Sequence, residues 1–155
     1  MKELLEYRAK LIDHLETVTE EFCQVCLAVA SAFTAVDEGG WNAHQLAAHA
    51  RDVHKIVYGM RIHRTAEEDN PVFRDFDAEQ WMSANYKADE PLASILDELS
   101  ASVKETAAML RELPSEAWSR ESSHEIYGGG FTLQTWVERG LAHIQEHLET
   151  VKKAS

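Results

Sequence analysis

Two histidines near the carboxyl end of the chain stand four residues apart, at His143 and His147. On a helix, residues at this spacing lie on the same face, one turn from each other. Both also fall on the apolar stripe of the last predicted helix, which consists of Leu133, Trp136, Gly140, His143, His147 and Val151. Imidazoles that face a bundle core need partners, and the usual ones are a metal, a carboxylate, a backbone carbonyl or water.

A third histidine, His49, lies on the apolar side of an earlier predicted helix. His44 and His54 stand five residues to either side, so each is turned by about 140° around that helix. We therefore expect His49 to face the core, and His44 and His54 to see solvent or the rim. Three neutral imidazoles suit Zn, Ni, Fe or Co and leave positions for water or substrate, as in catalytic sites. The prediction is a divalent transition metal on His49, His143 and His147.

Composition narrows the class of protein. The chain has 155 residues, 45% of them hydrophobic and 27% charged, with only seven glycines and three prolines. This favours one all-α domain over residues 1–155. The net charge of -12 argues against a nucleic-acid partner. No apolar run is long enough for a membrane span, the acidic start does not resemble a signal peptide, and two cysteines on one helix fit a reducing cytoplasm.

Apolar spacing predicts four helices, over residues 3–33, 42–65, 91–113 and 132–153. Asn42 and Thr132 are candidate N-caps of the second and fourth helices. The second and third helices are joined by a link of about 25 residues, residues 66–90, with a short helix expected over 77–86. Such a link is longer than a bundle hairpin needs, and it is long enough to cross the whole bundle.

The histidines favour one bundle topology. His49 lies about 10 Å into the second helix, and the midpoint of His143 and His147 lies about 12 Å from the end of the fourth. The three imidazoles are therefore nearly level if these two helices are antiparallel, and they miss by about 9 Å if the helices are parallel. We predict an up-down-down-up four-helix bundle, which requires a long crossover between helices two and three.

The same topology predicts a substrate pocket. The end of the first helix and the start of the third should lie at the level of His49. This places Phe22, Val25 and Cys26 on one wall, and Leu96 and Leu99 on another. Trp81 and Tyr86, in the long link, should stand near the mouth. A mostly apolar pocket anchored by a metal suits a small, partly hydrophobic molecule.

Asp52 and Glu146 lie one turn from metal ligands and are candidates for orienting a ligand or moving a proton. The alternative for both carboxylates is a solvated helix face. Cys26 is a candidate fourth ligand, although Cys23 and Cys26 fit better as small core residues. Arg139 precedes His143 by one turn as a single positive charge, and the sequence shows no cationic cluster.

The chain resembles the DinB-like four-helix bundles. The resemblance rests on His49 eight residues after Trp41, the long link, Leu113-Pro114 followed by Trp118, and Gly130-Phe131-Thr132-Leu133 leading to His143 and His147. It implies that the three histidines bind a metal and that the protein forms a homodimer. Relatives of this kind include thiol-dependent transferases and isomerases, so a low-molecular-weight thiol is a candidate co-substrate.

Two functions follow from these residues and the resemblance. The first is a metal-dependent transferase or hydrolase acting on a small molecule. The second is a non-catalytic, stress-associated bundle that binds a metal. The predicted ligands are the same for both, so the sequence leaves the choice open.

Overall fold

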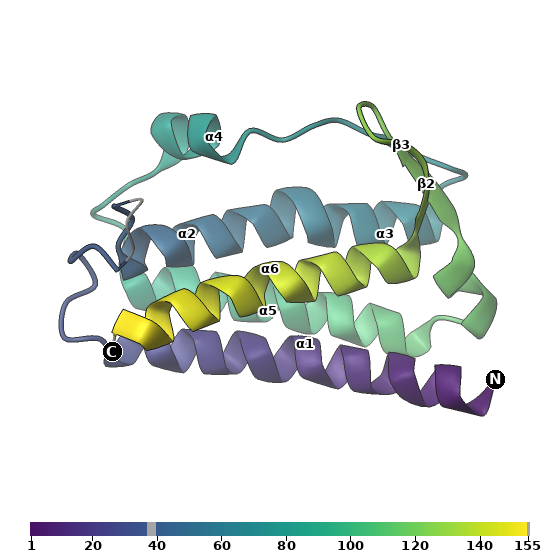
Figure 1. Cartoon of the computed structure of the whole chain (residues 1–155), viewed down its shortest axis with the longest axis horizontal. Helices are drawn as coiled ribbons and strands as arrows, with labels where there is room; N and C mark the ends of the chain where they lie inside the picture. The colour runs from purple at the N-terminus through teal and green to yellow at the C-terminus, as the bar shows by residue number, and fades with distance from the viewer. Residues whose placement is uncertain (37–39, 155) are drawn as a thin grey trace.

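The computed structural model describes residues 1–36 and 40–154 and confirms a helical bundle (Figure 1). Its long helical segments are α1 (Lys2–Ala28), a continuous helix made of α2 (Ala43–Val53), the π-helix η1 (His54–Tyr58) and α3 (Gly59–Glu67), then α5 (Leu92–Glu112) and α6 (Leu133–Ala154). Three of the four predicted ranges agree with these bounds to within about two residues. The predicted caps of α2 and α6 also form: the Asn42 side chain accepts from the Gln45 amide at 2.8 Å, and the Thr132 hydroxyl from the Thr135 amide at 3.2 Å.

The first helix ends at Ala28, five residues before the predicted end at residue 33. Val29 adopts an extended conformation, with φ -65° and ψ 147°. Beyond it, the Ala32 carbonyl accepts from the His44 amide at 3.0 Å, and the Phe33 ring stacks on the His44 imidazole. These contacts hold the start of α2. The apolar residues within 29–33 therefore belong to the connection between α1 and α2 and do not form another turn of α1.

Contacts between α2–α3 and α5 show that these helices run in the same direction. Arg51, in α2, forms an ion pair with Glu90, just before α5 begins. His63, in α3, lies 3.2 Å from the Thr106 hydroxyl, well along α5. The chain crosses the full length of the bundle between these two helices, as Figure 1 shows for the segment that carries α4 (Ala78–Asn85).

The last helix runs the opposite way past α2–α3. His49 meets His143 near the middle of α6, whereas Arg61 lies against Trp136, near its start. As residue numbers rise along α2–α3, their partners on α6 therefore fall. This antiparallel packing brings the three predicted ligands to one level.

A small three-stranded sheet at the end of the bundle where α6 begins corrects the all-α prediction. It consists of β1 (Val72–Phe73), β2 (Glu121–His124) and β3 (Gly128–Thr132), with β1 parallel to β2 and β2 antiparallel to β3. The buried Phe73 ring packs edge-on against Trp136, so the sheet ties the long link to the start of α6. The strands are too short and polar to show the alternation by which strands are recognised.

The long link is also held near the start of α2. The short helix α4 matches the predicted range of 77–86 within one residue. After α4, the Tyr86 hydroxyl lies 2.6 Å from Nδ1 of His44, which is 1% exposed. His54 is likewise buried, 3.2 Å from the Thr106 hydroxyl. The expectation that His44 and His54 see solvent or the rim is therefore wrong, because the link and α5 cover them.

Along the described residues, none of the helices has both the length and the apolar character that crossing a membrane requires.

The π-helical turn changes which residues of the second long helix face α6. Twelve residues of regular α-helix, at about 100° each, would set Arg61 about 120° around the axis from His49. In a π-turn each residue rotates by less, because the hydrogen bond spans five residues, as from the Gly59 amide to the His54 carbonyl. Arg61 is thereby turned back toward the face that carries His49.

Gly59 makes this turn possible, and replacing it tests the point. A Cβ at residue 59 would lie 2.5 Å from the His54 carbonyl oxygen and 2.9 Å from its Nε2. Alanine normally stabilises a helix relative to glycine, but here we expect Gly59→Ala to destabilise the fold by about 1–3 kcal/mol, through overpacking. Chemical denaturation measures the change. Gly129→Ala is the matched control, because its Cβ would meet only the Ser123 hydroxyl at 3.5 Å. Equal stability of both variants and the parent would contradict the argument.

Candidate metal centre

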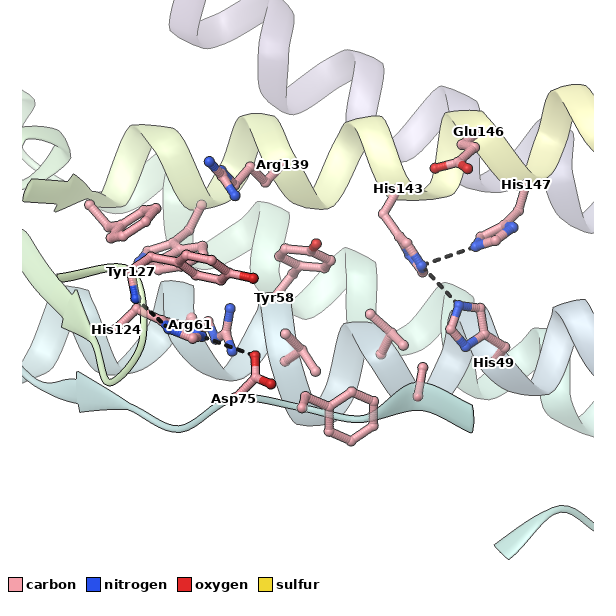
Figure 2. Close-up of a pocket in the computed structure, with 16 residues that line it drawn as sticks. His49, Tyr58, Arg61, Asp75, His124, Tyr127, Arg139, His143, Glu146 and His147 are labelled. Atoms are coloured by element: carbon pink, nitrogen blue, oxygen red, sulfur yellow. Dashed lines mark hydrogen bonds and ion pairs between the residues drawn. The ribbon is translucent and has the colours of Figure 1, made fainter. Parts of the chain in front are cut away.

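Three imidazoles converge between α2 and α6. The Nε2 atom of His143 lies 3.0 Å from Nε2 of His49 and 3.0 Å from Nε2 of His147. Among the described residues, these three form the group whose ligand atoms all lie within 4.8 Å of one another. Figure 2 shows the two α6 imidazoles directed toward that of His49. Ligands at about 2.0–2.1 Å from one metal ion are separated by about 3 Å, so the spacing fits a shared ion.

The electrostatics of the cluster also suit a metal. Burial, followed by the neighbouring histidines, lowers the pKa of His143 to about 2. Burial and His147 lower the pKa of His49 to about 4. Both imidazoles are therefore neutral near pH 7, which is the form that binds a metal. A neutral imidazole has one N–H and one lone pair, so three rings meeting through Nε2 cannot all satisfy each other, whereas a cation accepts all three lone pairs.

A cavity of about 410 Å³ extends from the histidines along the groove between α2–α3 and α6. Its size is in the range of small-molecule sites. Besides the three histidines, its walls are formed by Val53, Val57, Tyr58, Arg61, Asp75, Phe76, Ala78, His124, Tyr127, Phe131, Trp136, Arg139 and Glu146. The α3, link and hairpin residues close the end opposite the histidines, as Figure 2 shows.

His124 presents a defined donor at this opposite end. Its Nδ1 accepts from the backbone amides of Ile126 and Tyr127, at 3.1 and 3.3 Å. The neutral ring therefore carries its proton on Nε2. Nε2 in turn faces the Asp75 carboxylate across 3.6 Å. The hairpin between β2 and β3 thus sets the tautomer of a buried imidazole that lines the cavity.

Two arginines at the same end correct the prediction of a single positive charge. The Arg61 guanidinium carbon lies 4.7 Å from the centre of the Trp136 ring, and that of Arg139 lies 5.2 Å from the centre of the Phe131 ring. Those two rings stack on each other at 4.8 Å. Burial lowers the pKa of Arg61, Tyr58 and Asp75 partly oppose this shift, and repulsion from Arg139 makes a smaller contribution in the same direction as burial. Arg139 therefore has a cationic neighbour.

The two predicted catalytic carboxylates have different positions. Glu146 lines the cavity and lies beside His143 and His147 in Figure 2. Asp52 is not among the lining residues. Its carboxylate accepts from Trp81 Nε1 at 3.1 Å and from Arg51 Nε at 3.0 Å, which fastens α4 to α2. These contacts give Asp52 a structural role, and its catalytic role stays a prediction.

The predicted pocket walls lie inside the core. Phe22, Cys26, Leu96 and Leu99 are each at most 2% exposed, and Val25 packs against the same core. None of the predicted wall residues lines the cavity beside the histidines. α5 does pass at the expected level, since Glu98 pairs with Arg51. These side chains point into the bundle core, whereas the cavity lies in the groove between α2–α3 and α6. The prediction was therefore wrong about which side chains of the helices line the pocket.

The expected mouth residues serve structural contacts as well. Trp81 binds Asp52 and packs near the lining residue Phe76, with ring centres 5.9 Å apart. Tyr86 binds the buried His44. Burial raises the pKa of Cys26 to about 12, which disfavours the thiolate form that a metal requires. Among the described residues, the group that could hold a metal consists of the three histidines and does not include Cys26.

Sequence reasoning missed Tyr58, Arg61, Asp75 and His124. Arg61 falls off the apolar stripe of a regular helix, and only the π-turn returns it to the cavity. Asp75 and His124 lie in the link and the hairpin, where no helical period places a side chain. The pairing of β1 with β2, which puts Phe73 opposite His124, brings them together.

Comparison with known proteins identifies the fold and the family of this chain. The chain resembles the solved structure of YfiT from Bacillus subtilis, described as a probable metal-dependent hydrolase with an unusual four-helix bundle topology. The TM-score is 0.88 at 23% identity, over 97% of this chain and 86% of that one. No match was found among curated proteins. The model of the DinB superfamily matches residues 3–151, and the chain therefore belongs to the DinB superfamily.

Proposed function

We propose that this protein is a metal-dependent hydrolase of a small molecule, with His49, His143 and His147 as the ligands of a divalent transition metal. The observation that carries the proposal is the convergence of three imidazoles at one end of a 410 Å³ cavity. Three protein ligands leave coordination positions for water and substrate, which is the arrangement of catalytic rather than structural sites. The description of YfiT as a probable metal-dependent hydrolase is consistent with this proposal.

Different residues of the site have different roles in the proposed hydrolysis. When bound, the metal supplies Lewis acidity, which makes a water or thiol nucleophilic near neutral pH. We propose that Glu146, which lines the cavity, accepts the proton that the attacking water loses and returns it to the leaving group. The water oxygen forms the new bond to the acyl or phosphoryl centre while the bond to the leaving group breaks. Tyr58, whose ring centre is 5.6 Å from that of His143, shields one side of the centre from bulk solvent.

Thiol transfer is the second candidate. It uses the same metal chemistry but replaces the water by a low-molecular-weight thiol. Arg61 and Arg139 favour it, because natural thiols of this class carry carboxylates that cations recognise. Turnover of an electrophile that depends on an added thiol would select this candidate over hydrolysis.

We further infer that the helices follow an up-down-down-up order, supported by the antiparallel contacts of α2–α3 with α6 and the parallel contacts with α5. We also propose a homodimer. Light scattering after gel filtration tests the assembly, and a mass of one chain would refute it.

Removing a ligand should remove the metal. We expect His147→Ala to lose bound zinc or nickel, measured by elemental analysis after dialysis. The parent should gain thermal stability on metal addition, by about 2.7 kcal/mol at a hundredfold excess over Kd, and the variant should not. His14→Ala, on the exposed side of α1, is the control and should bind metal like the parent. A triple alanine variant at positions 49, 143 and 147 that still holds the metal would exclude the site.

Replacing the proposed proton acceptor should slow turnover without emptying the site. With a chromogenic ester, amide or phosphoester that the zinc-loaded protein hydrolyses, we expect Glu146→Gln to lower kcat about a hundredfold to ten-thousandfold, because general acid–base catalysis contributes that much. Metal content should stay unchanged. Glu149→Gln, an exposed carboxylate one turn further on, should behave like the parent. Equal kcat values in both variants would remove Glu146 from the mechanism.

A further inference from the structure

The geometry points to an anion-binding pole at the end of the cavity opposite the histidines, where Arg61 and Arg139 bind the carboxylate of a small substrate whose other end reaches the metal. This inference rests on the proposed function for the metal end only. It names the substrate class, a small monocarboxylate with a metal-binding or hydrolysable group some distance from its carboxylate.

Arg61 is the fixed element of the pole. The residue is only 7% exposed, although it carries a guanidinium. One of its terminal nitrogens donates to the Arg74 carbonyl at 3.0 Å, and the ring of Trp136 supports its face. Its Nε is enclosed and has no hydrogen-bond partner among the described residues. A buried donor without a partner is costly, so the hydrogen-bonding capacity of the Arg61 guanidinium is only partly used, and the residue lines the cavity in which a ligand anion would lie.

Arg139 is the adaptable element. It is exposed, it lines the same cavity, and its guanidinium rests against the Phe131 ring. Phe131 stacks on Trp136, which supports Arg61. The two guanidiniums are therefore each supported by one ring of a stacked aromatic pair. Aromatic support of this kind engages the faces of the guanidiniums and not their N–H edges.

The charges at this end favour a single negative charge on the ligand. Arg61 and Arg139 are cationic, and the nearest acid among the lining residues at this end is Asp75, which faces Nε2 of His124 at 3.6 Å. Two cations against one carboxylate leave an excess of one positive charge. The chain as a whole carries -12, so this excess is a local exception. Planar guanidinium forks match a planar carboxylate, and His124 Nε2–H adds a neutral donor nearby.

Small molecules with a thiol at one end and a carboxylate at the other can test whether the cavity binds a metal-bound thiolate at the histidines and an anion at the arginines. We would titrate straight-chain mercaptocarboxylates of increasing length, and the matching mercaptoamides, into the full chain loaded with cobalt. Cobalt reports thiolate binding by its absorption, and calorimetry gives Kd. For the chain length that fits, we expect the carboxylate to bind about ten- to a hundredfold more tightly than the amide, because hydrogen bonds to charged groups contribute that much.

Variants of the two arginines show which residue causes the preference for the carboxylate over the amide. Arg139→Gln should reduce the carboxylate-to-amide ratio to near one, while amide affinity and cobalt content stay as in the parent. Arg61→Lys, which keeps the buried charge, should lower the ratio in part. The matched control is Arg64→Gln: Arg64 also lies over an aromatic ring, that of Phe73, but it pairs with Glu68 and does not line this cavity. The control should retain the full preference.

The same titrations on metal-free protein separate this inference from the proposed function. A carboxylate preference that depends on Arg139 and persists without cobalt supports the pole even if no metal chemistry is found. Tight thiolate binding to cobalt with equal affinity for carboxylate and amide overturns the pole and leaves the metal site standing. The absence of any carboxylate preference in both forms, or an unchanged preference in Arg139→Gln, also overturns it.

Discussion

The arrangement of this protein depends on keeping three imidazoles together between two helices of a bundle. His49 is contributed by one helix, and His143 and His147 by another that runs antiparallel to it. Burial and the neighbouring histidines lower the pKa values of His143 and His49, so these two imidazoles are neutral near pH 7 and keep lone pairs that a metal would accept. The long link that crosses the bundle is what permits the antiparallel pairing, because the next helix then begins at the end where α2 began.

The link and the hairpin also build the cavity that makes the site accessible to a small molecule. After α3, the chain forms β1 on β2, and its next residues, among them Asp75 and Phe76, run along the groove. Phe73 and Trp136 lock this layer onto the start of α6. The sheet is small, but it supplies the wall opposite the histidines. Without it, the groove would lack His124, Tyr127 and Phe131 at that end.

The π-turn at His54–Tyr58 links the two ends of the cavity. It turns Arg61 onto the same face as His49 and places Tyr58 beside Gly140 of α6, where a Cβ would come within 3.2 Å of the Tyr58 Cβ. Glycine at position 140 lets α6 approach the second long helix closely at this point. π-turns cost hydrogen-bond geometry, and they occur most often at functional sites, where a side chain must be redirected. Here the redirected side chain is a buried arginine.

The sequence alone was sufficient to predict the helices, the caps Asn42 and Thr132, and the three histidines, because helical period and ligand spacing are local properties. The histidines also favoured the antiparallel arrangement, since chain length converts directly into distance along a helix. Tertiary structure decided the rest. The predicted pocket residues, such as Phe22 and Leu96, were assigned to the wrong face, because an apolar stripe does not say which neighbour it packs against. Arg61 and His124 entered the cavity through a π-turn and a strand pairing, which depend on contacts between distant segments that no local pattern records.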